Sequence, residues 1–203
     1  MPVITGTEGY AQEADNLAVQ YESFTFEALH KDVIPFFPPN ARNVLDIGAG
    51  TGRDAAGFTA RGLHVLAVEP VAEMRAHAMR LHPSPLITWL DDALPDLAKV
   101  RARGETFDIV MATAVLMHFD ADERAAIMKG VVPLLAPGGT LALSLRHGPT
   151  PPGRRMFPVD DDDIRTLGEA QGLETRLRLA GKRDKFQRDD VTWSRLVFGK
   201  PAI

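Results

Sequence analysis

The chain has 203 residues, of which 45% are hydrophobic and 25% charged, a composition typical of a globular protein with one sizeable core. Disordered, collagen-like and coiled-coil chains are therefore excluded. The formal net charge of −4 gives no general positive field, so we do not expect a nucleic-acid partner.

The absence of cysteine excludes disulfides, thiolate metal sites and cysteine nucleophiles, and it suits a reducing compartment. Met1–Asp15 is acidic and lacks the cationic start and apolar run of a signal peptide. No uncharged apolar stretch reaches the roughly 18 residues that a membrane span needs. We therefore expect a cytoplasmic protein with no membrane partner and no metal site.

The first predicted element, Tyr10–Phe37, is an aromatic-rich segment that is helical in one or two pieces. Two placements are open for it. The segment forms either a lid over the carboxyl ends of the strands or a helix packed on the sheet.

Short apolar runs then alternate with longer amphipathic segments, a rhythm typical of βαβ units and a parallel sheet. Asn43–Ile47 and Leu63–Val68 are predicted strands, and Asp54–Arg61 between them has helical spacing. Two further strands are predicted at Leu86–Leu90 and at Phe107–Ala112, the latter rich in β-favouring residues.

The next predicted helix is Asp122–Leu135, with Asp120 as its N-cap and Pro137-Gly138-Gly139 as its stop. A fifth strand follows at Thr140–Leu145. The acidic run Asp160–Asp163 suits the solvated N-terminus of a helix over Ile164–Gln171, and we assign it no chemistry.

Leu173–Leu179 and Val191–Phe198 alternate apolar and polar residues, which predicts an antiparallel pair at one edge of the sheet. Lys182–Asp190 between them is a charged loop. The basic residues here suit a solvated edge or an approach to an acidic or phosphorylated substrate: Arg176, Arg178, Lys182, Arg183, Lys185 and Arg188.

These elements together predict one α/β domain over residues 1–203. Its sheet is seven-stranded and mostly parallel, with the last strands antiparallel and helices on both faces in three layers. Residues 1–41 would form an N-terminal helical cap, residues 42–147 the core, and residues 148–203 a C-terminal helix and strand pair.

A glycine-rich loop, Gly48-Ala49-Gly50-Thr51-Gly52, connects the first strand to the next helix. Glycines there let the backbone turn tightly and approach a ligand at the carboxyl edge of the sheet. A dinucleotide fingerprint would need glycine where Arg53 stands, and the Gly-Lys-Ser/Thr of a P-loop is absent. Asp46 and Glu69 flank the loop, and Glu69 ends the second strand, where a carboxylate can accept hydrogen bonds from ribose hydroxyls.

The sequence here resembles the class I S-adenosylmethionine (SAM) dependent methyltransferases, most closely over residues 42–147. The resemblance rests on five motifs in order: Val44–Gly52, Glu69, Asp92-Ala93, Phe107–Val110 and Leu135–Gly139. It implies a Rossmann-like fold, SAM as the cofactor, and methyl transfer to a small-molecule acceptor.

The resemblance also implies roles for individual residues. The glycine loop would run beside the methionine part of the cofactor, with Asp46 near its amino group. Glu69 would bind the ribose hydroxyls, while Asp92, or Asp91 if the strand slips by one residue, would bind the adenine amino group. The implied cofactor-binding set is Tyr21, Asp46, Gly48, Ala49, Gly50, Gly52, Glu69, Pro70, Asp92, Ala93 and Ala114.

Methyl transfer needs alignment more than covalent catalysis, but a hydroxyl acceptor would gain from a general base. The candidates for catalysis are His118 and His147, with Arg146 placed to hold an anionic acceptor. Each has a structural alternative, a wall histidine or an ion pair. Two other functions stay open: a nicotinamide-dependent oxidoreductase, which Arg53 disfavours, and a SAM-binding protein without transfer activity. The sequence predicts neither the acceptor nor the oligomeric state.

Overall fold

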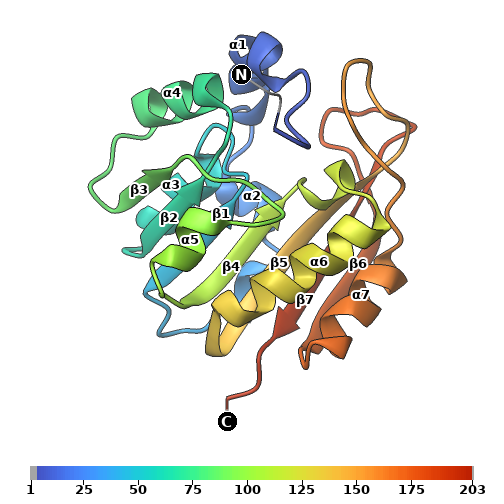
Figure 1. The fold of residues 1–203 in the computed structure, drawn as a ribbon. Coiled ribbons are helices and arrows are strands. Elements are labelled where there is room, and N and C mark those ends of the chain that lie inside the picture. The colour runs from blue at the N-terminus through green and yellow to red at the C-terminus, as the bar shows by residue number, and fades with distance from the viewer. Residues whose placement is uncertain (1–3, 203) are drawn as a thin grey trace.

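The structure is a computed structural model that describes residues 4–202, so residues 1–3 and 203 of the expected domain lie outside the described residues. Seven strands form one sheet in the order β3-β2-β1-β4-β5-β7-β6 (Figure 1). Their bounds are β1 Asn43–Ile47, β2 His64–Val68, β3 Ile87–Leu90, β4 Phe107–Thr113, β5 Leu135–His147, β6 Glu174–Arg183 and β7 Thr192–Gly199. Strands β1 to β5 are parallel, and β7 pairs antiparallel with both β5 and β6. The predicted mostly parallel sheet with an antiparallel C-terminal pair is confirmed.

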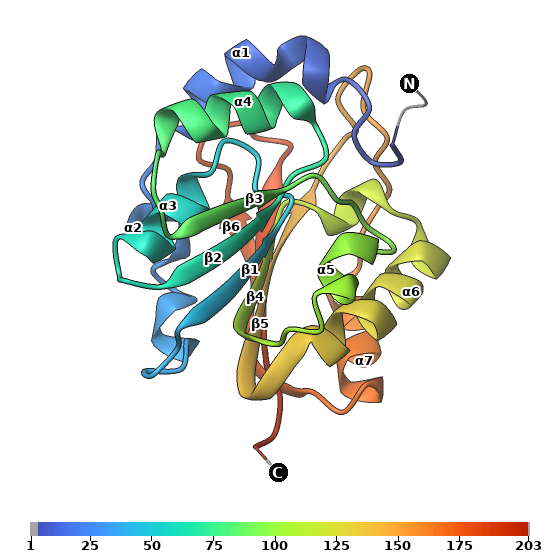
Figure 2. The same ribbon diagram turned by 60° about the vertical axis from the view of Figure 1, so that its left-hand side comes forward.

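Helices cover both faces of this sheet, as Figure 2 shows edge-on. Helices α2 and α3 lie on one face and α5, α6 and α7 on the other, which confirms the three-layer α/β/α arrangement. The helices are α1 Tyr10–Tyr21, α2 Phe26–His30, α3 Arg53–Thr59, α4 Ala72–Leu81, α5 Ala98–Ala102, α6 Ala121–Val131 and α7 Asp161–Ala170. Short 3-10 helices are η1 Ile34–Phe36, η2 Leu116–His118 and η3 Val132–Leu134.

The core consists of two apolar layers, because successive residues of each buried strand face opposite sides of the sheet. On β1, Leu45 and Ile47 belong to the cluster beneath α5, α6 and α7, whereas Val44 packs with Phe58 of α3. Phe58 is fully buried. Burial of one such side chain contributes about 2–3 kcal/mol, so these layers hold the strand ends in a fixed position.

The N-terminal segment forms two helical pieces. One lies as a lid over the carboxyl ends of the strands and the other packs on the sheet, so each of the two predicted placements describes one piece. Helix α1 packs against α4 above the carboxyl edge of the sheet, where Leu17 contacts the cluster that contains Met74 (Figure 2). Helix α2, whose N-cap Thr25 accepts from the N–H of Ala28, packs on α3 through Phe26. Helix α1 therefore covers the carboxyl edge of the sheet, and α2 belongs to the helical layer on one face of the sheet.

Several elements differ from the prediction. Helices α4 and α5 were not predicted, and α6 gives way to η3 before the expected end at Leu135. Strand β5 begins at Leu135 rather than Thr140, so the Pro-Gly-Gly stretch lies within a strand. Gly139 allows this because a Cβ there would lie 2.8 Å from the carbonyl oxygen of Ala136, and the β4–β5 register shifts nearby, between Phe107 and Ile109.

Strand β6 forms one edge of the sheet, and its charged side chains Glu174, Arg176 and Arg178 are exposed. It extends to Arg183, which shortens the predicted charged loop at its start. No helix among the described residues is long and apolar enough to cross a membrane.

Candidate active site

A cavity of about 620 Å³ lies at the carboxyl ends of the central strands, under α1. Its wall includes the glycine loop after β1, the start of α4, the segment after β3, the loop after β4, and parts of β5, β7 and the loop between β6 and β7. Parallel strands bring these segments together because all of their carboxyl ends meet at one edge. Predicted cofactor-binding residues in the wall include Tyr21, Ala49 and Pro70.

The glycine loop presents its backbone to this cavity. Gly48 has φ +69°, and a Cβ there would lie 2.7 Å from a methyl carbon of Val115, so a side chain does not fit. Asp46, at 1% exposure, lines the cavity from β1, and its Oδ2 has no hydrogen-bond partner among the described residues. Burial raises the pKa of Asp46 well above its usual range, and the negative charge of Asp54 adds to the shift. A buried carboxylate oxygen that lacks a hydrogen-bond partner is suited to a cationic ligand group.

Glu69 holds the glycine loop against the end of β2. Its Oε2 accepts from the N–H of Gly50 and its Oε1 from the N–H of Val71, both at 2.8 Å. Burial raises the pKa of Glu69 to about 7, against the opposing effect of these two N–H groups. Each oxygen keeps a second lone pair that can accept a ligand hydroxyl.

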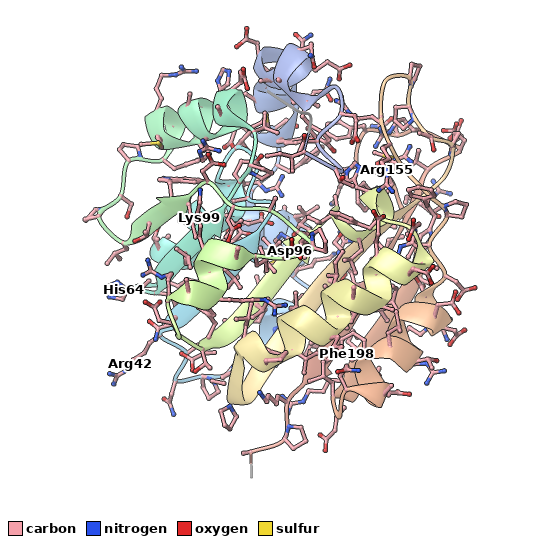
Figure 3. The ribbon with its side chains drawn as sticks, in the orientation of Figure 1. Arg42, His64, Asp96, Lys99, Arg155 and Phe198 are labelled. Atoms are coloured by element: carbon pink, nitrogen blue, oxygen red, sulfur yellow. The ribbon has the colours of Figure 1, made fainter. Side chains whose placement is uncertain are left out.

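Asp92 lines the cavity together with Ala93, and Asp91 lies outside the wall, where it pairs with Arg75. The Asp92 carboxylate already accepts hydrogen bonds from backbone N–H groups of the protein. Its Oδ2 accepts from the N–H of Val100 and from that of Lys99 on α5, labelled in Figure 3, and its Oδ1 accepts from the N–H of Ala93. The adenine role that the resemblance implies for Asp92 and Ala93 stays a prediction.

His118 follows β4 on η2 and lies in the wall beside α1. Its Nδ1 donates to the carbonyl oxygen of Arg155, labelled in Figure 3, so Nε2 is unprotonated and accepts from the Tyr10 hydroxyl at 3.0 Å. Burial lowers the pKa of His118 and keeps the ring neutral. Ala114, a further predicted residue, lines the same wall with φ +61°.

Two predicted residues lie outside the cavity lining. Gly52 caps α3, where a Cβ would lie 2.8 Å from the ring of Trp89. Nε2 of His147 forms a hydrogen bond with Ser194 Oγ at 2.7 Å, and the same nitrogen lies 3.3 Å from Asp161 Oδ1. Because His147 alternates with Arg146 along β5, it points away from the cavity that Arg146 lines and is not placed to act as a base there.

Sequence reasoning missed a polar network beside the glycine loop. Asp54 accepts at 2.9 Å from each of three groups: Nε of Arg53, the Thr113 hydroxyl and, across 24 residues, Nε2 of the fully buried His30. Burial alone would raise the pKa of Asp54, but His30 and Arg53 outweigh it and hold that pKa well below its usual range. The helical pattern of Tyr10–Phe37 gave no sign that its single histidine, His30, is fully buried.

Comparisons with known proteins agree with this geometry. Residues 44–139 match the family described as "Methyltransferase domain". Uncharacterized methyltransferases from Mycobacterium bovis and Mycobacterium tuberculosis are 33% identical over 178 residues, an alignment that covers 82% of this chain. The chain spans 63% of the length of these relatives.

Solved structures with similar folds cover most of the chain. They include N-methyltransferase NodS from Bradyrhizobium japonicum in complex with S-adenosyl-L-homocysteine (TM-score 0.68, 16% identity, 95% of this chain and 98% of that one). A TehB-like SAM-dependent methyltransferase from Corynebacterium glutamicum has a TM-score of 0.67 at 19% identity, covering 93% and 98%. Magnesium protoporphyrin IX methyltransferase from Synechocystis with bound SAM has a TM-score of 0.65 at 16% identity, covering 95% and 84%. Residues 44–139 are therefore a methyltransferase domain, and the chain has the fold of the class I SAM-dependent methyltransferases, so the resemblance stated from its motifs is confirmed.

Proposed function

We propose that this chain transfers a methyl group from SAM to a small-molecule acceptor in the cavity under α1. One observation carries the proposal: a glycine-rich loop turns around the cavity between two buried carboxylates, Asp46 and Glu69. The unpartnered oxygen of Asp46 fits an ammonium group, and the free lone pairs of Glu69 fit a pair of ribose hydroxyls.

Some residues of the site would hold the cofactor, and others would align the acceptor. Asp46, Gly48, Gly50 and Glu69 would hold the cofactor, with the adenine beside Asp92. When bound, SAM supplies a methyl group on a positively charged sulfur, which a nucleophile displaces in line. The protein then has to align the acceptor and exclude water, and α1 covers the cavity for that purpose.

His118 is retained as a candidate base for a hydroxyl acceptor, because its neutral Nε2 lies in the wall and accepts a hydroxyl in the structure. A nitrogen or sulfur acceptor would not need it. The proposal treats residues 1–203 as one domain with residues 1–41 as the cap, and it keeps the cytoplasmic location that the cysteine-free composition favours.

Two measurements test the proposal. Calorimetry with S-adenosylhomocysteine, SAM and NAD should detect the first two ligands and not the third; binding of NAD without SAM would favour the oxidoreductase. Methyl-labelled SAM, incubated with a panel of small hydroxyl, amine and thiol compounds, should give labelled product. Tight SAM binding with no transfer across the panel would instead favour a SAM-binding protein without transfer activity.

A further inference from the structure

Two arginines on neighbouring strands line the cavity on its β5–β7 side. In the antiparallel register, Ser144 lies opposite Arg195, and Arg146 lies opposite Trp193. All four side chains project from the same face of the sheet and line the cavity. Arg146 and Arg195 are therefore diagonal neighbours, a relation that places such residues about 7–8 Å apart and lets long side chains reach one group.

Both guanidinium groups are buried without a contacting carboxylate among the described residues. Each arginine is 8% exposed. Nη1 of Arg146 donates to the carbonyl oxygens of Gly148 and Pro149, and Nη1 of Arg195 donates to Ser144 Oγ and the carbonyl oxygen of Ser194. Within residues 4–202, no carboxylate oxygen lies within 4.0 Å of either guanidinium. Burial lowers the pKa of both groups, and acids at longer range, Asp184 for Arg146 and Asp54 for Arg195, offset only part of this effect.

The other arginines of the cavity wall that have little exposure are each neutralised by an acid. Arg154, with a side chain 6% exposed, pairs with Glu13 at 2.6 Å, and Arg53, 16% exposed, pairs with Asp54 at 2.9 Å. The more exposed Lys182 and Arg188 also pair with acids. A buried cation is costly unless an anion compensates it. The fold supplies a contacting anion for Arg53 and Arg154. Arg146 and Arg195 have only more distant acids, so an anionic ligand would be their first contacting counter-charge.

We infer that the methyl acceptor is a small carboxylic acid whose carboxylate binds Arg146 and Arg195. Nε and Nη2 of each arginine make no hydrogen bond to the described residues, and a planar guanidinium presents such donors in a fork that matches a carboxylate. Trp193 adds an apolar surface, because its indole N–H is already taken by Asp184 Oδ1 and its ring lies in the wall. The acceptor is thus a carboxylate on an apolar body. This inference rests on the proposed function.

Matched pairs of acids and amides provide the test. The protein, saturated with S-adenosylhomocysteine, is titrated by calorimetry with benzoate, phenylacetate and hexanoate and with the primary amide of each. At least one acid should bind about tenfold or more tightly than its amide, the loss expected when a charged hydrogen-bonding partner is removed. Arg146→Met and Arg195→Met should each abolish the difference, and Arg146→Lys should keep part of it.

Arg176→Met is the matched control, because Arg176 is exposed on β6 outside the cavity wall and the substitution removes the same charge. Thermal unfolding verifies that each variant is folded. Equal binding of acids and amides, or an acid preference that survives both methionine substitutions, would overturn the inference. So would weaker binding of S-adenosylhomocysteine in those variants with an intact acid preference, because the arginines would then serve the cofactor's own carboxylate. Failure of S-adenosylhomocysteine to bind the unaltered protein would count against the proposed function itself.

Discussion

Affinity for S-adenosylhomocysteine should depend on the protonation state of Glu69. Burial raises the pKa of this carboxyl to about 7 in the protein without ligand. In the proposed complex, the ribose hydroxyls donate to its oxygens, so the ligand favours the ionised form. Below pH 7, binding must therefore release the proton from Glu69. The affinity should rise as the pH increases to about 7 and then level off.

The expected loss of affinity follows from how far the pH lies below the pKa of Glu69. Each unit corresponds to about 1.4 kcal/mol, or tenfold in affinity. At about pH 5.5, one and a half units below the Glu69 pKa, the ligand should bind about 30-fold more weakly than at pH 8, a difference of ~2 kcal/mol. Glu69→Gln cannot ionise, so it should lose this dependence and bind about 1–3 kcal/mol more weakly at pH 8.

Calorimetry across this pH range, in two buffers of different ionisation enthalpy, measures both the affinity and the number of protons released. Glu73→Gln is the control, since Glu73 is an exposed acid on α4 outside the cavity wall. Asp46 is present in both variants, and because the charge of Glu69 contributes to its raised pKa, the difference in slope between the variants measures Glu69 together with its effect on Asp46. A flat profile in the unaltered protein, or the same slope in Glu69→Gln and Glu73→Gln, would refute the reasoning.

Three further outcomes are expected. Gly48→Ala should lower the free energy of unfolding by about 1–2 kcal/mol and impair S-adenosylhomocysteine binding, because alanine disfavours φ +69°; unchanged denaturation and calorimetry would contradict this. Asp54→Asn should cost about 3 kcal/mol at pH 7 by removing the buried negative charge beside His30 and Arg53. Since the folded pKa of Asp54 is depressed, this stabilisation should begin to fall below about pH 4, the pKa of the unfolded carboxyl, and decrease progressively as the pH is lowered further in denaturation curves. Tyr10→Phe should speed amide hydrogen exchange in α1, because the bond to His118 is lost; identical exchange would show that this bond does not hold the helix.

Features with a local sequence signal were predictable. The glycine loop was located from its residue types alone, and the structure places it between a strand and a helix as expected. Asp120 was recognised as an N-cap, and the structure adds the reciprocal bond from the backbone N–H of Asp120 to Glu123 that completes a capping box. Such signals span a few residues, so they do not depend on the rest of the fold.

Features that depend on distant contacts were not predictable. Tyr10 and His118 are 108 residues apart, and only the packing of α1 over the sheet brings them together. Arg195 reads as one polar position in an alternating strand, and its place in the cavity follows from the register of β7 against β5. Helix α5 has five residues, too few to show a helical period, and it is held by Asp92 from outside its own sequence.

The edges of the sheet govern how separate copies of this chain can meet. Unpaired backbone groups along an outer strand invite a strand from another molecule, and repeated addition of this kind leads to fibres. Strand β3, at one margin, offers four residues, and β6, at the other, would force an incoming strand to lie beside Glu174, Arg176 and Arg178. Concentrated solutions should thus resist growth by strand addition.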